Sequence, residues 1–218
     1  MTRTAPPVRL GLLAAARIAA KAVVAPLRDA EAVPGIDLVA LAARDPGRAA
    51  EAADRWGIRR VHGSYEELLG DPDVDAVYIA TPASLHRPWA VAAIEAGKHV
   101  LCEKPFARDA GEARAMLEAA EAAGVVHLLG AEFRFAPGQA LLTRTLRNGR
   151  IGDPQFAMFK LQLPSLCDPT AEVPDWWSDA AHGGGWFGAY GSHVIDQIRS
   201  SLGEFESVSA SLQTLAPR

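Results

Sequence analysis

The stretch AVYIATPASLHRPWAVAAIEAGKHVLCEKP, residues 76–105, decides the fold of this chain. An apolar run over Asp75–Ala80 predicts a buried strand, and a turn follows it. Leu85–Ala96 predicts a helix, and His99–Cys102 predicts a second short buried strand. Two such strands separated by a helix are typical of a right-handed crossover between neighbouring strands of a parallel sheet.

The same alternation continues on both sides of this stretch. It predicts an α/β fold over residues 1–132: a doubly wound parallel sheet of the Rossmann type, which binds dinucleotides at the carboxyl ends of its strands. The further strands are expected at Val8–Leu13, Asp37–Ala43 and Val125–Leu129. The further helices are expected over 14–28, after the N-cap residues Asp45 and Ser64, and over Asp109–Ala123 before Gly124.

The pattern changes beyond this point, and we expect a second domain over residues 133–218. Helices are predicted at Pro137–Arg147 and Ser192–Leu202. Residues 164–185 are rich in Pro, Asp, Trp and Gly, which is typical of a functional loop.

Gln155–Leu163 and Glu206–Leu215 alternate apolar and polar side chains, which predicts two strands of a mostly antiparallel sheet. Two strands bury too little apolar surface to complete a domain, so we expect this α+β domain to be partial. Its exposed apolar surface predicts a homodimer.

The composition is that of a globular protein, with 49% hydrophobic and 22% charged residues among 218. The net charge of −4 predicts no attraction to nucleic acid or to an anionic membrane. Cys102 and Cys167 are too few for a disulfide framework, so we expect a reducing, cytoplasmic location. Residues 8–26 faintly resemble a signal peptide, but basic residues interrupt them, and no stretch is apolar enough to span a membrane. No cluster of residues has metal-ligand spacing.

The turn after the first strand, GLLAAARIA at 11–19, is where backbone N–H groups and a helix N-terminus would meet a pyrophosphate. The expected Gly-x-Gly-x-x-Gly is absent, since alanines occupy all three glycine positions. By itself this turn fits a cofactor site and an ordinary connection equally. The candidate cofactor-binding residues here are Ala14, Ala16, Arg17 and Ile18.

The end of the second strand bears on the choice of cofactor. An acidic residue there hydrogen-bonds the ribose of NAD, whereas an arginine can bind the 2′-phosphate of NADP. Arg44 occupies this place, which favours NADP over NAD. The alternative is that Arg44 is a solvated surface charge.

Residues 76–105 resemble, almost position by position, the Gfo/Idh/MocA family of glucose–fructose oxidoreductase, inositol dehydrogenase and their relatives. The resemblance implies that Thr81, Pro82 and His86 lie along the nicotinamide side of a cofactor cleft. It also implies that Glu103-Lys104-Pro105 is the signature tripeptide, with a cis peptide bond before Pro105 and with Lys104 directed at the reacting carbon.

A second block, GGGWFGAYGSHVIDQI at 183–198, also resembles the family. The family pattern is matched by Gly184, Gly185, Gly191, His193 and Asp196. The family's first aspartate is replaced by Ala189, which removes one polar contact. AEFRFAPGQALLTRTLRNGRIGDP, residues 131–154, resembles the start of the family's second domain, which normally continues past residue 218.

The chemistry that this resemblance implies is hydride transfer between a nicotinamide and a secondary alcohol or ketone. An imidazole suits the uptake of the hydroxyl proton, which makes His193 the general acid/base. An ammonium suits stabilisation of the developing alkoxide, which is the role expected of Lys104. Asp196 either hydrogen-bonds substrate or orients His193 from one helical turn away. Trp176, Trp177 and Trp186 either stack on a sugar or close an interface.

Three hypotheses follow. The first is an NAD(P)-dependent oxidoreductase that acts on a sugar, a polyol or a related cyclic alcohol. The second is a truncated or degenerate nucleotide-binding protein without turnover, which the alanines of the first turn and Ala189 favour. The third is a reductase of a non-sugar compound of the dihydrodiol or tetrapyrrole type.

Overall fold

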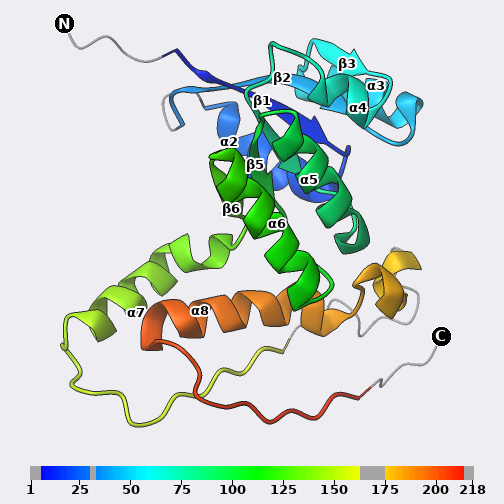
Figure 1. Cartoon of the computed structure of the whole chain (residues 1–218). Coiled ribbons are helices and arrows are strands. Elements are labelled where there is room, and N and C mark those ends of the chain that lie inside the picture. Colours follow the sequence, from blue (N-terminus) through cyan, green and yellow to red (C-terminus); the bar gives the residue numbers. More distant parts are fainter. Residues whose placement is uncertain (1–5, 30–32, 163–174, 214–218) are drawn as a thin grey trace, which may run out of the picture. The chain divides into compact units, whose positions relative to one another are not determined.

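The computed structural model describes residues 6–29, 33–162 and 175–213 (Figure 1). The chain divides into two compact units between Gly130 and Ala131. The sequence interpretation placed the boundary two residues later, at 132.

The first unit contains a six-stranded parallel sheet with the strand order β3-β2-β1-β4-β5-β6. This order, with β1 at the centre and crossovers in both directions, is that of the doubly wound Rossmann fold. The edge strand β3 is the one strand that the sequence analysis did not predict. The strands are β1 (Val8–Leu13), β2 (Ile36–Ala42), β3 (Arg60–His62), β4 (Ala76–Ile79), β5 (His99–Cys102) and β6 (His127–Leu129).

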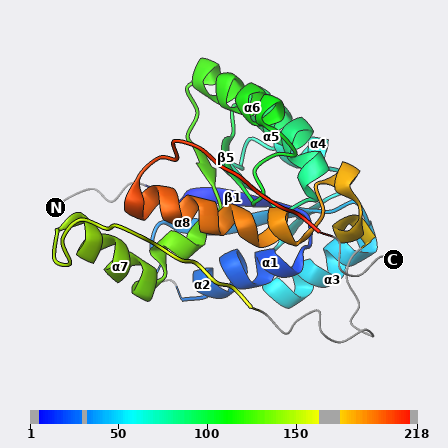
Figure 2. The same cartoon turned by 90° about the horizontal axis from the view of Figure 1, so that it is seen from below.

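Helices cover both faces of this sheet (Figure 2). On one face, β1 side chains such as Leu12 pack against a continuous helical segment over 17–27 and against α3 (Pro46–Trp56). That segment comprises α1 (Arg17–Ala19), a π-helical turn (Ala20–Val24) and α2 (Ala25–Leu27). On the other face, Leu13 belongs to the core that α4 (Tyr65–Leu69), α5 (His86–Glu95) and α6 (Ala110–Ala123) cover.

Helix ends follow local capping chemistry, which the sequence predicts at Asp45 and Ser64; Asp109, predicted as the first helical residue, is also a cap. The side chains of Asp45, Ser64 and Asp109 each accept a hydrogen bond from the backbone N–H three residues later. Gly57 and Gly124 end α3 and α6 with φ angles of 74° and 66°, which only glycine adopts without strain. These local contacts explain why those boundaries agree closely with the sequence analysis.

The second unit is helical in its described part. A short 3₁₀ helix at Glu132–Phe135 leads into α7 (Pro137–Arg147). Further on, 3₁₀ turns at Asp175–Ser178 and Ala180–His182 precede a π-helical turn at Phe187–Gly191, which continues into α8 (Ser192–Leu202).

α7 and α8 pack through polar side chains. The buried residues of α8 are His193, Gln197 and Ser201, one helical turn apart. Gln197 hydrogen-bonds Gln139 of α7, and the hydroxyl of Ser201 lies 3.1 Å from that of Thr143. Hydrogen bonds between polar side chains therefore help to fix how these two helices meet.

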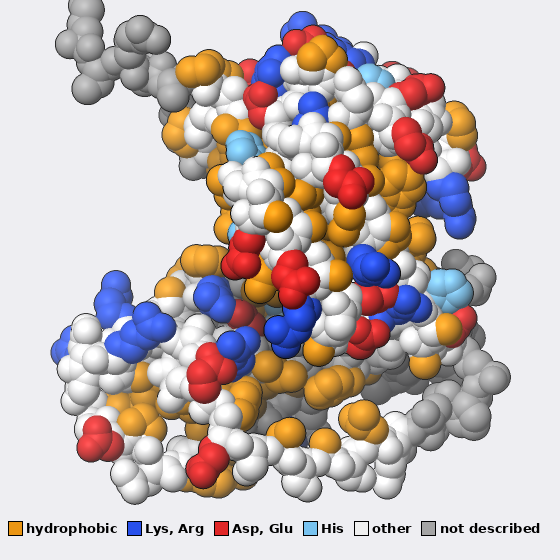
Figure 3. All heavy atoms as spheres, viewed as in Figure 1, with side chains coloured by type: hydrophobic (Ala, Val, Ile, Leu, Met, Phe, Trp, Pro, Cys, Tyr) orange, Lys and Arg blue, Asp and Glu red, His pale blue; other side chains and the backbone are white. Residues whose placement is uncertain are grey.

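The predicted antiparallel sheet is not confirmed. Residues 155–162 and 206–213 form no strand, and the remainder of both predicted strands lies outside the described residues. Their apolar side chains are exposed, including Phe156 at 81% and Val208 at 88%. Alternation gives a strand only where neighbouring backbone completes its hydrogen bonds, and the described part of this unit supplies none. Apolar side chains are visible on the lower part of the surface in Figure 3.

Cys102 is a buried free thiol of β5, and burial raises its pKa. Cys167 lies outside the described residues, as does the part of the predicted loop 164–185 that precedes Asp175. Within the described ranges, no helix has the length and apolar character that crossing a bilayer requires. Those ranges also contain no group of three or more His, Cys, Asp or Glu side chains placed to hold a metal ion.

A charged network ties the loop before β4 to the sheet. The Asp71 carboxylate pairs with Arg60, lies 3.0 Å from Nε2 of His62 and accepts a 2.8 Å hydrogen bond from the backbone N–H of Asp73. The buried ammonium of Lys98 donates to the carbonyls of Asp71 and Val74, at 2.7 and 2.8 Å. Burial alone would raise the pKa of Asp71, but the hydrogen bonds from Arg60 and Asp73 outweigh it and hold the pKa at about 2.

We predict that Asp71→Asn lowers the free energy of unfolding at pH 7 by about 1–3 kcal/mol, because the buried side chain loses its charge opposite Arg60 and an acceptor oxygen of its hydrogen-bond network. The pKa of Asp71 is lowered in the folded state, so its contribution is present above the unfolded pKa of about 3.9 and is lost as pH falls towards about 2. Urea unfolding at several pH values measures this, and the difference from the parent should shrink over that window. Asp54→Asn, at an exposed position of α3, is the control. Equal losses in both variants would contradict the prediction.

Candidate active site

The turn after β1 carries the first group of predicted cofactor residues. Ala14 has a φ of 96°, a conformation that strains a residue with a β-carbon, and its N–H donates to the carbonyl of Ala42 at 2.9 Å. Ala16 is extended at the N-cap and offers no side-chain hydrogen bond to the helix that begins at Arg17. Ile18 belongs to the first helical turn and packs against the sheet. The first N–H groups of the helix therefore have no side-chain cap, which fits an anion such as a pyrophosphate.

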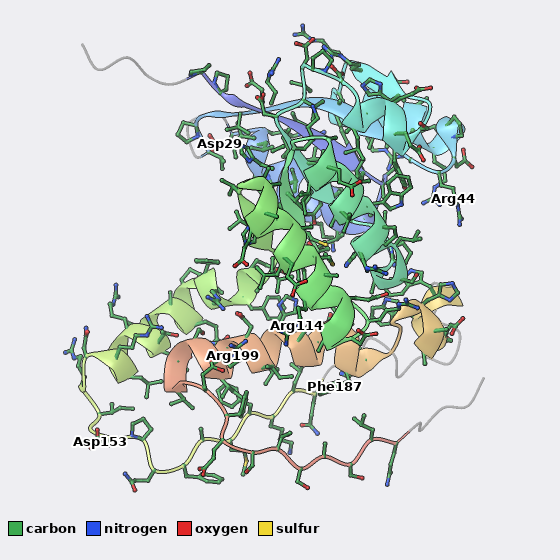
Figure 4. All side chains as sticks on the ribbon, viewed as in Figure 1. Asp29, Arg44, Arg114, Asp153, Phe187 and Arg199 are labelled. Carbon is green, nitrogen blue, oxygen red and sulfur yellow. The ribbon has the colours of Figure 1, made fainter. Side chains whose placement is uncertain are left out.

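Arg44 is exposed just beyond the end of β2, from which it projects outward (Figure 4). The register pairs Leu13 of β1 with Ala42 of β2, so Arg44 follows its strand at the same edge of the sheet as the turn. This position fits contact with a ribose or its phosphate, and it equally fits a solvated charge.

Thr81 and Pro82 follow β4 at this same edge. The Thr81 side chain is buried, and its hydroxyl has no hydrogen-bond partner among the residues that the structure describes. A buried polar atom in that condition costs free energy unless a ligand or water completes it. The Thr81 hydroxyl therefore fits a site in which a bound nucleotide cofactor supplies the missing hydrogen-bond partner.

His86 is buried at the start of α5, and both ring nitrogens face backbone carbonyls. Nε2 lies 2.8 Å from the oxygen of Thr81, and Nδ1 lies 2.9 Å from that of Pro105. Burial lowers the pKa of His86, and a neutral ring donates to one of these carbonyls at a time. The side chain thus connects the loops that follow β4 and β5. The sequence predicts His86 along the nicotinamide side of the cleft; a direct hydrogen bond from its ring to a cofactor would require one of these contacts to break.

The signature tripeptide follows β5. The peptide bond between Lys104 and Pro105 is cis, as the resemblance implied. The Glu103 carboxylate is buried and accepts hydrogen bonds from the hydroxyl of Tyr78 at 2.5 Å and from the N–H of Lys104 at 3.2 Å. Since Ile79 pairs with Cys102, Thr81 and Lys104 follow adjacent strands by the same number of residues. The parallel sheet therefore brings them together at one edge.

In the second unit, His193 is 2% exposed and lies on the face of α8 that meets Glu132–Phe135. Its ring stacks on Phe133, with centroids 3.9 Å apart and an angle of 8° between the planes. Its Nε2 lies 3.8 Å from Oε1 of Glu132. Asp196, one turn further along α8, forms a two-armed ion pair with Arg134. Because Arg134 engages both carboxylate oxygens, it competes with substrate and with His193, the two partners predicted for Asp196.

The glycines of the second motif allow close packing. A β-carbon at Gly184 would lie 2.2 Å from the carbonyl oxygen of Trp176, and one at Gly191 would lie 2.7 Å from the ring of Phe187. Gly185 has a φ of 105°. No larger residue fits at Gly184 without displacing backbone, or at Gly191 without displacing the Phe187 ring.

The loop aromatics contact one another in a chain. Trp176, Trp177 and Trp186 pack edge to face, with centroids 6.1 Å apart at each step, and Trp186 stacks on Tyr190 at 4.2 Å. All four are half-buried. This row of four rings ends at Tyr190, next to the helix that carries His193.

Comparison with known proteins identifies the family. A family model described as "Oxidoreductase family, NAD-binding Rossmann fold" matches residues 10–131, and a model of the Gfo/Idh/MocA C-terminal domain matches residues 140–218. The chain belongs to the Gfo/Idh/MocA oxidoreductase family. The resemblance inferred from residues 76–105 is therefore confirmed.

Several relatives are named dehydrogenases. The chain is 38% identical to levoglucosan dehydrogenase of Pseudarthrobacter phenanthrenivorans over 81% of its own length and 45% of that protein. It is 43% identical to trans-1,2-dihydrobenzene-1,2-diol dehydrogenase of Mus musculus over 55% of its length and 36% of that protein. A solved levoglucosan dehydrogenase in complex with NADH and levoglucosan matches with a TM-score of 0.79 and 30% identity, over 91% of this chain and 55% of that one. The chain spans about half the length of these relatives or less.

Sequence analysis missed the partners of the predicted residues. Tyr78 looked like one more apolar strand residue, and nothing in its neighbourhood indicated a carboxylate partner. Glu132, Phe133 and Arg134 were recognised only as the start of the second domain. Consecutive residues of a 3₁₀ turn point about 120° apart, so their adjacency in the sequence gave no signal that all three contact α8.

We predict that Ala14→Gly raises the free energy of unfolding by up to about 1 kcal/mol, because relief of the positive φ exceeds the extra entropy of glycine in the unfolded chain. Ala16→Gly is the matched control, since φ −83° and ψ 149° suit alanine, and it should be neutral or destabilising. Thermal and urea unfolding measure both. A loss of stability in Ala14→Gly as large as that in Ala16→Gly would count against strain at Ala14.

Proposed function

We propose that the chain is an NAD(P)-dependent oxidoreductase that transfers a hydride between the nicotinamide and a secondary alcohol or ketone of a sugar, a polyol or a related cyclic compound. The observation that carries this proposal is the buried, unpartnered hydroxyl of Thr81 among the described residues, beside an uncapped helix N-terminus and the Lys104 signature at one edge of the sheet. Membership of an oxidoreductase family supports it.

The roles divide between the two units. When bound, the cofactor supplies hydride exchange at the carbinol carbon. The helix start at Ala16–Ile18 holds the pyrophosphate, Glu103 and Thr81–Pro82 hold the nicotinamide side, and His86 keeps these loops in place. Lys104 stabilises the alkoxide, and His193 takes or returns the hydroxyl proton. Asp196 acts through its pair with Arg134, which fixes the start of α8.

The names of the relatives favour a cyclic alcohol as substrate. Levoglucosan and dihydrobenzenediol both denote rings that bear hydroxyl groups. The chain of half-buried aromatic rings at Trp176–Tyr190 supports a sugar, whose apolar face stacks well on such rings. Closure of an interface by the same rings is the alternative use. The dihydrodiol relative keeps a non-sugar substrate as the second candidate.

The cofactor is NADP or NAD. Arg44 favours NADP, because a guanidinium pairs with a 2′-phosphate. The similar levoglucosan dehydrogenase structure, by contrast, contains NADH. Replacement of Arg44 separates these alternatives.

A nucleotide-binding protein without turnover is the other class of function. The strained Ala14 and the missing carboxylate at Ala189 favour it. It shares the cofactor site with the main proposal and differs only in turnover.

We predict that NADPH and NADH change the protein's fluorescence in a saturable way, and that Arg44→Ala weakens the binding of NADPH at least about tenfold more than that of NADH.

The parent should oxidise members of a panel of sugars, polyols and cyclic diols. Lys104→Ala and His193→Ala should each lower kcat by about a hundredfold or more, whereas the exposed His127→Ala should not. Absence of binding at millimolar cofactor would refute the proposal, and tight binding without turnover would support the second class.

We also propose that the chain forms a homodimer through the exposed apolar side chains of its second unit. Residues such as Phe135, Phe156 and Met158 are each more than 70% exposed. Burial of this surface in a partner copy is favourable by about 25 cal/mol per Å². Light scattering should give a mass near twice that of one chain. A monomer that binds no hydrophobic dye would contradict the proposal.

A further inference from the structure

The imidazole of His193 is held by the short helix Glu132–Phe135. Its ring is 2% exposed and lies flat against Phe133, which fixes the plane of the ring. Its Nε2 lies 3.8 Å from Oε1 of Glu132. Glu132 belongs to the turn immediately before Phe133, so one backbone segment sets both contacts.

Two other positions could have supplied a carboxylate to this ring. Asp196 lies one turn later on α8, but both of its oxygens are engaged by Arg134. The residue one turn earlier is Ala189, whose buried methyl group carries no charge and accepts no hydrogen bond. Glu132 therefore reaches the imidazole where its own helix supplies no uncommitted carboxylate.

We propose that Glu132 is a positioning residue that orients the His193 imidazole and stabilises its protonated form. This inference rests on the proposed function, in which His193 exchanges the proton of the substrate hydroxyl. A separation of 3.8 Å is that of an ion pair rather than of a hydrogen bond, and such contacts shorten when a catalytic site is filled.

The position of the carboxylate determines which nitrogen does the chemistry. A carboxylate at Nε2 favours the tautomer that carries its proton there, which places the basic lone pair on Nδ1. Nδ1 is itself buried, so the proposal requires the substrate hydroxyl to enter the site and reach it. The hydroxyl proton then moves from the substrate oxygen to Nδ1, and the ring becomes an imidazolium. Glu132 stabilises that positive charge, as a carboxylate does for a histidine base in other enzymes.

Among the described residues of this unit, the charged side chains that contact His193 or the helical turn carrying it are Glu132, Arg134 and Asp196. Arg134 and Asp196 neutralise each other through their two-armed pair. From α7, the neighbouring contact to α8 is Gln139 with Gln197, which is uncharged. Glu132 is 46% exposed, so its field is partly screened by water but is not cancelled.

The first test measures His193 directly in the full chain without any cofactor. Imidazole signals of the labelled protein are followed by NMR against pH, and His193 is assigned by its absence in His193→Ala. Glu132→Gln should lower the pKa of His193 by about half a unit or more, because it removes a neighbouring negative charge. Glu132→Asp, which keeps the charge, should restore most of the shift. Glu206→Gln removes the same charge from an exposed position and should change nothing.

The second test uses turnover. Glu132→Gln should lower kcat about tenfold and move the acidic limb of the kcat profile for alcohol oxidation to lower pH, because the neutral base then persists to lower pH. The cofactor affinity should stay within twofold of the parent. A merely structural role would leave the position of this limb unchanged.

The two proposals fail in different ways. An unmoved His193 titration in Glu132→Gln would overturn the role of Glu132, whether or not the parent turns over. A parent that neither binds nor uses a nicotinamide would overturn the proposed function, while the NMR titration would still decide the Glu132–His193 contact.

Discussion

Parallel pairing of β1, β4 and β5 is the constraint on which the first unit depends. Leu13 pairs with Ile79, and Ile79 pairs with Cys102, so the three chains leave the sheet at the same level. Parallel strands need crossover helices, and each crossover returns the chain to the opposite edge before the next strand begins. Every segment that follows a strand therefore arrives at one edge. The buried hydroxyl of Thr81, the buried carboxylate of Glu103 and the ammonium of Lys104 therefore follow their strands at this edge. The strand register alone accounts for their placement.

The second unit solves a different problem, because its candidate base lies on a helix. α8 buries a polar face and leaves apolar side chains such as Ile195 exposed. Such a face is stable only if each polar group finds a partner. The helix Glu132–Phe135 and α7 provide these partners, so the position of His193 depends on its stack on Phe133, on the Arg134–Asp196 ion pair and on the hydrogen bonds of Gln197 and Ser201. Those contacts are more directional than apolar packing, which suits a side chain that must hold one orientation.

Sequence predicted best those features that local chemistry determines. The caps at Asp45 and Ser64 and the glycine end at Gly124 need only a few neighbouring residues, and each was placed correctly. β3 was missed because three residues at an edge carry too little pattern. Residues 155–162 show the opposite error, since alternation is required for a half-buried strand but does not supply the neighbouring strand. The partners of His193 and Asp196 could not be predicted, because they depend on how a turn more than fifty residues earlier packs against α8.

The ammonium of Lys98, enclosed by two carbonyl oxygens, has a chemical consequence. An acylating reagent must reach the amine, and the nitrogen of Lys98 is buried with its N–H groups donated to two carbonyl oxygens. Lys21 on the exposed side of the first helix and the half-buried Lys104 offer easier access. Amine-selective modification of the first unit would therefore discriminate among its lysines, and acylation of Lys98 would report that the loop before β4 has opened.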